Sequence, residues 1–316
     1  PTGNEAFLIL DADVYSIKQM AVDIEDSSSI GRLFDMDVID AENGKLSRAA
    51  LGLPQRTCLI CGAPGRYCAR NRTHSIYELQ NACASILRDA LATHDAQIIA
   101  EKCILALLYE LNTTPKPGLV DRRNCGSHRD MDCFTFARST VSLFPYFERC
   151  AKIGMQTAHL PPTQTFQALR QQGRMAEGEM FAATGGVNTH KSAIFSMGIL
   201  AGAFGRLPTN HWKAPELVLA EAAAMTAGLT AADFGRQLTG QAASTGEQLY
   251  NQFGITGARG QAEAGFPAVL KGLYVLENGL QQGYSLDLAG SSALLTILIN
   301  NTDTNLIHRS SRAAQL

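Results

Sequence analysis

Two carboxylates, a histidine and a lysine stand close together near the middle of the chain, and their types suit catalysis on a phosphorylated substrate. Glu177 and Glu179 flank a glycine, and His190 and Lys191 follow eleven residues later. Carboxylates and imidazole can transfer protons or stabilise a developing cation, and lysine binds phosphate. The sequence therefore predicts a functional loop over Glu177–Lys191.

Small residues inside this stretch indicate an anion site. Gly185 and Gly186 allow backbone N–H groups to approach a ligand, and the helix expected to follow adds the positive end of its dipole. In the alternative interpretation, Asn188 or Thr189 only caps that helix. Capping does not require the neighbouring carboxylates, histidine and lysine, so the functional interpretation is favoured.

A second polar segment, Thr114–Asp132, combines prolines with charged side chains. Lys116, Arg122 and Arg123 offer positive charge for phosphates, while Asp121 and Asp130 offer oxygen ligands for Mg²⁺. A helix-connecting loop with a solvated charge cluster would have the same composition, and the segment alone does not decide between the two.

Two more polar segments lie further along. In Thr256–Pro267, Arg259 and Glu263 are four residues apart and would form an ordinary helix ion pair, whereas the glycines around Arg259 favour close approach to a ligand. In Asn301–Arg309, Asp303 and Asn305 are candidate ligands for a metal or a ribose.

The N-terminal region carries a different set of residues. Asp35 and Asp37 are expected on a strand, where a D-x-D pair places both carboxylates on one face for Mg²⁺. Cysteines at 58, 61 and 68, with His74, have the side-chain types of a zinc site, and C-x₂-C is the usual half-site. Only one such pair is present, so buried thiols without metal are the favoured interpretation and zinc is the alternative.

Bulk composition limits the class of protein. The chain has 316 residues, 46% of them hydrophobic, with a formal net charge of −2. These values are typical of a folded enzyme and do not predict binding to nucleic acid or an anionic membrane. No signal peptide or membrane-spanning run is recognised, so the eight cysteines are interpreted as thiols or metal ligands, and a cytoplasmic location is expected. The start at Pro1 suggests a fragment.

The elements that must position these residues differ between two regions. Over 1–78 short β-like runs surround one helical pattern at Val14–Asp26, with a turn at Asn43-Gly44, which predicts a small α+β region. Over 79–316 amphipathic patterns predict an all-α domain, with the boundary near His74–Glu78. The predicted helical stretches are Ala96–Leu111, Phe134–Ile153, Lys191–Phe204, Pro215–Ala227, Ala262–Leu280 and Leu286–Ile299. The predicted fold class is therefore mainly α.

The four polar segments, taken in order, resemble the triphosphoribosyl-dephospho-CoA synthase family. The matching motifs are TPKPGLVD, EGEMF with GVNTHK, TGARGQAEAG and DTN with the later Arg309, spanning about Ala96–Arg309. The resemblance implies an enzyme that joins ATP to 3′-dephospho-CoA, with Mg²⁺ accompanying ATP, and releases adenine. Its product, 2′-(5″-triphosphoribosyl)-3′-dephospho-CoA, is the precursor of the citrate lyase prosthetic group.

Loss of adenine from C1′ of the ribose resembles glycoside cleavage, which passes through an oxocarbenium-like transition state. Roles follow from side-chain chemistry within this resemblance. The catalytic candidates are Glu177, Glu179 and His190; the candidates for binding substrate or phosphate are Lys116, Arg122, Asn188, Lys191, Arg259, Glu263, Asn305 and Arg309; and the Mg²⁺ candidates are Asp121, Asp130 and Asp303. Either Glu177 or Glu179 is expected at the cation or at the attacking hydroxyl.

The first 78 residues resemble the C-terminal half of holo-citrate lyase synthase, which attaches the finished group to the acyl carrier subunit. The matching stretches are AFLILDAD, GRLFDMDVID and LGLPQRTCLICGAPGRYCARNRTHS. This resemblance implies a Mg²⁺ site at Asp35 and Asp37, the acyl carrier subunit as partner, and an incomplete transferase site.

A non-catalytic module that binds nucleotide or carrier is the alternative function. The synthase family has glycine where this chain has Ser192, Ser310 and Ser311, and it continues beyond this C-terminus. A Cβ at such positions would weaken binding if the backbone had to approach a phosphate or adopt a positive φ. A zinc-stapled interaction domain is a third interpretation, which the ordered motifs disfavour.

Overall fold

The structure is a computed structural model that describes residues 6–234 and 245–301. The chain divides into two compact units, Pro1–Thr93 and His94–Leu316, and the division falls within the long helix α3 (Ile76–Asn112). Each unit is described separately. Over the described residues the fold is mainly α-helical, with one two-stranded sheet, which confirms the predicted fold class.

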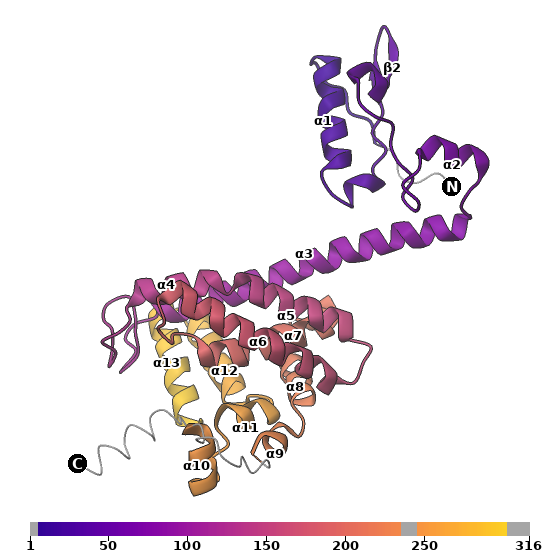
Figure 1. Cartoon of the computed structure of the whole chain (residues 1–316). Coiled ribbons are helices and arrows are strands. Elements are labelled where there is room, and N and C mark those ends of the chain that lie inside the picture. Colours follow the sequence, from indigo (N-terminus) through magenta and orange to yellow (C-terminus); the bar gives the residue numbers. More distant parts are fainter. Residues whose placement is uncertain (1–5, 235–244, 302–316) are drawn as a thin grey trace. The chain divides into compact units, whose positions relative to one another are not determined.

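The N-terminal unit contains short elements followed by the first turns of α3 (Figure 1). Before α3 its elements are α1 (Val14–Asp26), η1 (Gly31–Leu33), β1 (Val38–Asp40), β2 (Gly44–Leu46), η2 (Arg48–Leu51) and α2 (Gly65–Asn71). Helix α1 has the predicted bounds, because the Asp13 carboxylate accepts a hydrogen bond from the Ser16 N–H and so caps the helix. The predicted Asn43-Gly44 turn is confirmed, with Gly44 at φ +78° and Val38 opposite Leu46.

The β-like run Phe7–Leu10 was expected to be a strand, and this prediction is wrong. The run forms no strand, and its side chains are strongly exposed, with Ile9 at 100%. A strand needs a hydrogen-bonding partner and a surface to cover, and no described residue supplies either to this run.

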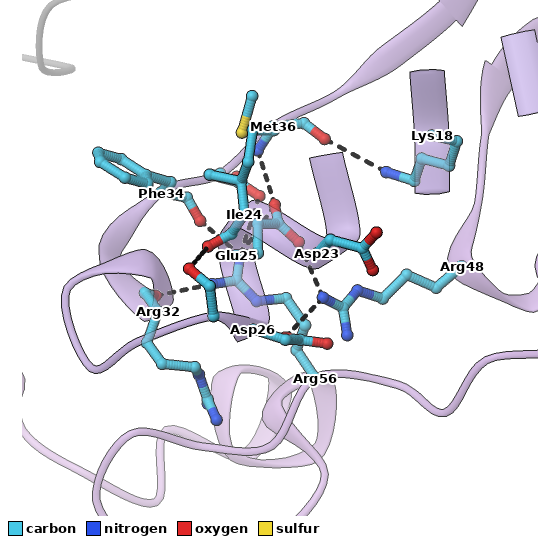
Figure 2. A network of polar contacts seen from close by, with 12 residues as sticks. Lys18, Asp23, Ile24, Glu25, Asp26, Arg32, Phe34, Met36, Arg48 and Arg56 are labelled. Atoms are coloured by element: carbon cyan, nitrogen blue, oxygen red, sulfur yellow. Dashed lines mark hydrogen bonds and ion pairs between the residues drawn. The ribbon is translucent and has the colours of Figure 1, made fainter. Parts of the chain in front are cut away.

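Charged groups occupy the interior of the N-terminal unit. Its buried apolar side chains, among the residues described, are Ala21, Val22 and Cys68, whereas Glu25 and Lys18 are also buried. Figure 2 shows the resulting network of polar contacts. The Glu25 carboxylate pairs with Arg48 at 3.0 Å and Arg56 at 3.5 Å, and it accepts the Met36 N–H at 2.8 Å. The Lys18 ammonium donates to the Met36 carbonyl at 3.2 Å.

The second unit is a stack of helices around one apolar core (Figure 1). Its elements after α3 are α4 (Cys133–Ser142), α5 (Phe144–Thr157), α6 (Pro162–Thr184), α7 (Lys191–Arg206), η3 (Thr209–His211), α8 (Pro215–Met225), α9 (Leu229–Phe234), α10 (Thr245–Phe253), α11 (Gly257–Glu263), α12 (Pro267–Gln281) and α13 (Leu286–Ile299). Phe147, Met180 and Ile199, from α5, α6 and α7, are among the fully or almost fully buried side chains of this core.

Helices α5 and α7 approach each other so closely that only glycine fits between them. A Cβ placed on Gly154 would lie 2.1 Å from the Gly202 carbonyl oxygen, and one on Gly205 would lie 2.2 Å from the Ala151 oxygen. Both distances are far inside van der Waals contact. These glycines are therefore required by packing and not by a turn.

Two predicted helical stretches are each divided in the structure. The stretch Phe134–Ile153 is α4 and α5, separated at Leu143 ahead of Pro145. The stretch Ala262–Leu280 is the end of α11 and then α12, separated at Gly265 and Phe266, whose φ values are +73° and +52°. Proline near the start of each second helix explains where the new helix begins.

Contrary to expectation, one stretch, Pro215–Phe234, has the length and mean hydropathy (1.3) of a membrane span. In the structure it is α8 and α9, divided by a turn at Thr226–Gly228. Val218, Met225 and Leu229 in this stretch belong to the core of the helical unit. Packing in the core thus accounts for part of its apolar composition, since 28% of the most apolar window is buried.

Candidate functional site

The predicted loop Glu177–Lys191 is mostly helix. Glu177 and Glu179 lie within α6, which continues to Thr184, and the connection to α7 spans only Gly185–His190. This corrects the expectation of a long loop. Gly178 lies inside this helix, and packing of α6 against its neighbouring helices offsets the ~1 kcal/mol cost of a glycine in a helix interior.

The connection Gly185–His190 folds back over one face of α6. Glu177, Met180 and Thr184 share that face because they are spaced three and four residues apart. The His190 N–H donates to the Met180 sulfur at 3.1 Å, and the Thr184 hydroxyl donates to the Val187 carbonyl at 2.7 Å. Glu177 is therefore on the same side of α6 as the end of the connection.

His190 is buried and neutral at neutral pH. Its Nδ1 lies 2.7 Å from the Ser139 hydroxyl, which also accepts a hydrogen bond from Thr189, and its ring meets Phe136 edge-on at 4.9 Å. Burial lowers the pKa of His190 to about 4. Neither Asn188 nor Thr189 caps α7, since His190 is the N-cap residue and makes no side-chain cap, so the simple capping alternative fails.

The two glutamates of α6 pair with different helices. Lys191, the first residue of α7, lies 3.1 Å from the Glu177 carboxylate, and Arg149 of α5 lies 2.9 Å from Glu179. Residues two apart on a helix point to different sides. Glu177 thus lies next to Lys191 at the N-terminus of α7, while Glu179 faces α5.

Residue Ser192 occupies an ordinary helical position. It is the second residue of α7 and is exposed. The positive φ that would have demanded glycine there does not occur. Ser310 and Ser311 lie outside the described residues.

In the segment Thr114–Asp132, two predicted binding residues are already engaged within the protein. Lys116 has 1% of its side chain exposed, and its ammonium lies 2.7 Å from the Glu110 carboxylate and 2.7 Å from the Glu110 carbonyl. The Asp121 carboxylate accepts four hydrogen bonds, from Thr114, Arg123 and Asn124. Burial alone would raise the pKa of Asp121, but these donors outweigh it and lower the pKa. Both side chains hold the segment together.

The same segment packs against the distant helix α13. Arg122 forms an ion pair with Asp287, the second residue of α13, and also donates to the Asn112 carbonyl. The Asp287 carboxylate further accepts the Thr114 N–H at 3.1 Å. Arg122 is 41% exposed, so it remains within reach of a ligand.

A small apolar cluster joins this segment to the α6–α7 connection. Val120 and Met131 are buried in it, and Val187 packs against them together with Phe136 of α4. The structure thus brings two of the four polar segments together. Asp130, at the edge of this region, is 63% exposed and lies 3.8 Å from His128.

The segment Thr256–Pro267 forms α11, but the predicted Arg259–Glu263 pair does not form. The Arg259 guanidinium lies 2.8 Å from Asp233 and stacks over the Phe234 ring at 5.1 Å. The Glu263 carboxylate accepts hydrogen bonds from Thr230 and from the Gly228 N–H, and these bonds, that from the Thr230 hydroxyl first, lower its pKa.

A pocket of about 300 Å³ lies in the N-terminal unit and one of about 200 Å³ lies beside α11. The second is lined by Thr256, Gly257, Gln261 and Asn301, so it joins the third polar segment to the start of the fourth. The remaining predicted residues of the fourth segment, Asp303, Asn305 and Arg309, lie outside the described residues.

In the N-terminal unit, Asp35 and Asp37 precede β1 and do not lie on a strand, which corrects the prediction. Asp37 pairs with Lys45 at 2.5 Å, and Asp35 is 90% exposed and 3.6 Å from Arg56. The pocket of this unit is lined by Arg32, Leu33, Phe34, Asp35, Arg56, Thr57, Leu59 and Cys83. The pocket therefore holds two guanidinium groups, both of which also donate to backbone carbonyls of the unit, and one exposed carboxylate.

The predicted cysteine and histidine residues do come together. The ligand atoms of Cys58, Cys61, Cys68 and His74 all lie within 4.8 Å of one another. Contact with His74 is the main cause that lowers the pKa of Cys61 to about 6, and contact with Cys61 raises the pKa of Cys68. All eight cysteines are free thiols.

Sequence reasoning missed several distant partners of the predicted residues. Four of them are Ser139, Arg149, Asp233 and Asp287, each separated in sequence from its partner by between 26 and 165 residues. Only Asp287 carried a local signal, as an acidic residue in the first turn of a predicted helix. The other three look like ordinary polar positions on amphipathic helices.

Comparison with known proteins assigns families to both parts. A family model described as ATP:dephospho-CoA triphosphoribosyl transferase (CitG) matches residues 96–316, and one described as apo-citrate lyase phosphoribosyl-dephospho-CoA transferase (CitX) matches residues 1–90. The chain therefore belongs to the CitG family and carries a CitX-like part in front of it, as in proteins named CitXG.

Three relatives support this. Protein CitXG of Haemophilus influenzae is 38% identical over 98% of this chain and 66% of its own length, and Protein CitXG of Leuconostoc mesenteroides subsp. cremoris is 33% identical over 99% and 68%. The 2-(5″-triphosphoribosyl)-3′-dephosphocoenzyme-A synthase of Haemophilus ducreyi is 38% identical over 79% of this chain and 80% of its length. The chain spans about two thirds of the CitXG relatives. No solved structure matches it.

Proposed function

We propose that the helical unit is a transferase that makes the precursor of the citrate lyase prosthetic group from ATP and 3′-dephospho-CoA, with release of adenine. The observation that carries this proposal is the synthase family match over residues 96–316, together with the pairing of Glu177 and Lys191 at one end of α7. The protein is proposed to act in the cytoplasm, where both substrates are found.

The reaction breaks the bond from ribose C1′ of ATP to adenine and forms a bond from C1′ to a ribose hydroxyl of dephospho-CoA. The hydroxyl proton leaves, and adenine takes up a proton. A carboxylate beside C1′ stabilises the positive charge that develops there. Glu177 suits this role because it is partly exposed, and its partner Lys191 stands at a helix N-terminus that attracts phosphate.

Glu179 is assigned a positioning role. Its carboxylate holds Arg149 of α5 and points to a different side of α6 from Glu177. Through Arg149 this carboxylate ties α6 to α5 and so supports the position of Glu177 on the same helix. His190, buried and uncharged at neutral pH, suits hydrogen bonding through Ser139 better than binding of phosphate.

Mg²⁺ fits as an ion that arrives with the triphosphate. It usually takes one or two protein carboxylates and completes its shell with phosphates and water, so that it neutralises charge on the transferred group. Asp130 has a largely exposed carboxylate that could contact it. Asp121 fits poorly, because four hydrogen bonds would have to be broken or weakened.

The experiment incubates the protein with ATP, Mg²⁺ and dephospho-CoA and measures free adenine. Wild type is expected to release adenine, and Glu177→Gln is expected to abolish release, with an unchanged melting temperature. Glu179→Gln, the matched variant on the same helix, is expected to retain part of the activity. Release of adenine by Glu177→Gln at the wild-type rate would refute its role. Binding of ATP without adenine release by wild type would favour a non-catalytic module instead.

For the N-terminal unit, we propose recognition of an anionic coenzyme A derivative or the acyl carrier subunit. Arg32 and Arg56 line its pocket, and guanidinium groups bind diphosphates in bidentate fashion. The test is binding of the purified acyl carrier subunit to wild type and to Arg56→Gln. Equal binding to both would exclude this pocket as the contact.

A further inference from the structure

We propose that Cys58, Cys61, Cys68 and His74 bind one Zn²⁺, and that this ion holds the N-terminal unit in its folded form. The inference is independent of the proposed synthase activity. It is carried by three observations, concerning the spacing of the ligand atoms, the backbone around them and an unpartnered histidine nitrogen.

The ligand atoms already have the spacing of a metal site. All four lie within 4.8 Å of one another, and the sulfurs of Cys61 and Cys68 are 3.4 Å apart. Zn–S bonds of about 2.3 Å in a tetrahedron place two sulfurs roughly 3.8 Å apart, so little movement is needed. A disulfide would require the sulfurs to approach to about 2.05 Å.

The backbone around the first two cysteines forms a tight turn that points both sulfurs to one side. The Cys58 N–H donates to the Ala63 carbonyl at 2.6 Å, and Gly62 has the left-handed φ of +72°. The Ile60 N–H points at the Cys58 sulfur at 3.5 Å. An N–H group directed at sulfur stabilises the thiolate, which is the form that binds zinc.

The other two ligands come from a second turn. Cys68 lies in α2 and is buried, and the chain leaves this helix through Arg72 in the left-handed conformation, at φ +48°. The Thr73 N–H then donates to the Cys68 carbonyl at 3.1 Å, and His74 follows. The left-handed residue therefore reverses the chain so that His74 returns to the sulfurs.

His74 supplies the observation that points to an ion. Its Nε2 is buried and has no hydrogen-bond partner of ordinary geometry, although the His74 side chain lies in contact with Cys61. Buried polar nitrogens almost always have a partner, and leaving one unpaired costs about 1–3 kcal/mol. A metal bound to the imidazole would supply the missing partner.

The N-terminal unit also has a physical need for such an ion. Its described apolar core consists of a few small side chains, and small domains with such cores commonly depend on a structural metal. Four protein ligands leave no open position on zinc, which is the arrangement of a structural site and not of a catalytic one.

The ion would act on the pocket through residues next to Cys58. The Arg32 guanidinium donates to the Thr57 carbonyl at 2.6 Å, and Arg56 donates to the carbonyls of Phe34 and Arg32 at 2.8 and 2.6 Å. A metal ion that holds Cys58 in place would therefore also restrict Arg56 and Thr57, the two residues before it. Loss of zinc is expected to loosen both arginines of the 300 Å³ pocket.

The test is elemental analysis of the full chain purified under reducing conditions. Wild type is expected to contain one zinc per chain, and Cys61→Ser and His74→Ala are expected to lose it. The matched control is Cys125→Ser, since Cys125 is an exposed thiol in the helical unit, and it is expected to keep the metal. Co²⁺-substituted wild type is expected to show thiolate charge-transfer absorption that Cys61→Ser lacks.

A second measurement needs no variant. Titration of wild-type thiols with a mercurial is expected to release zinc into a chromogenic chelator. Three outcomes would overturn the proposal: metal-free wild type, zinc retained by Cys61→Ser together with His74→Ala, or a Cys61–Cys68 disulfide detected by mass in the freshly purified protein. Adenine release is not the readout, so failure of the synthase proposal would leave this test unaffected.

Discussion

The two units of this chain are stabilised in different ways. The helical unit buries large apolar side chains such as Phe147 and Ile199, whereas the N-terminal unit buries Glu25 and Lys18 among a few small apolar groups. In an apolar core, a small reduction of one side chain removes only a small part of the packing energy. In a buried charge network, removal of one member leaves its partner as an uncompensated buried charge. Stability is therefore spread over many apolar contacts in the helical unit, whereas in the N-terminal unit it depends on a few charged groups.

The largest effect is expected from a cavity in the helical core. Phe147→Ala removes a fully buried ring and should lower the free energy of unfolding of the helical unit by about 3–5 kcal/mol. Trp212, the single tryptophan, packs edge-on against Phe204 in this unit, so its fluorescence during urea denaturation reports the change. A shift below about 1 kcal/mol would contradict the apolar account.

A somewhat smaller effect is expected when the charge network of the N-terminal unit is broken. Glu25→Ala leaves Arg48 and Arg56 without their buried partner and should cost about 3 kcal/mol. Hydrogen exchange of α1 amides should then accelerate by roughly 100-fold, while Trp212 fluorescence shows little change. Asp23→Ala, an exposed carboxylate on the same helix, is the control. Equal exchange in both variants would show that burial of Glu25 adds nothing.

The smallest effect is expected from pH in the helical unit. Burial lowers the pKa of His190 from 6.5 to about 4, so below pH 6.5 the unfolded chain binds a proton that the folded chain does not. Stability from this residue is present above pH 6.5 and falls as the pH drops toward 4. The loss between pH 7 and pH 5 is about 2 kcal/mol. Urea denaturation of wild type and of His190→Gln at pH 7 and pH 5 measures the part of this loss that comes from His190. An equal change in the free energy of unfolding in the two proteins would contradict burial of a neutral imidazole.

Local patterns predicted much of the fold and part of the site. The bounds of α1 and the start of α7 at Lys191 followed from apolar spacing, because this spacing is set by neighbours in sequence. The loop expected from Glu177 onward was wrong because helix packing continues α6 to Thr184, and the chain turns only at Gly185 and Gly186. Four zinc-type residues were identified together, and the structure adds that they converge.

Contacts between distant residues could not be predicted from local patterns. The pairing of Arg122 with Asp287 and of His190 with Ser139 depends on how whole helices pack. The same packing decides that Lys116 and Asp121 face inward, although they were expected to bind phosphate and Mg²⁺, or else to lie in a solvated charge cluster. Side-chain type predicted the chemistry, but only the fold decides which groups remain available for it.

The glycine contact between α5 and α7 has a consequence for the geometry of the proposed site. The backbones of α5 and α7 are in direct contact at Gly154 and Gly202, and this contact fixes the distance between the two helices. These two helices carry Arg149 and Lys191, which pair with Glu179 and Glu177 of α6. The contact therefore helps to fix the distance between the two ion pairs. A wider side chain at Gly154 would move these two cations apart. Under the proposed function, a residue that touches no ligand would thus help to set the position of Lys191 and its partner Glu177.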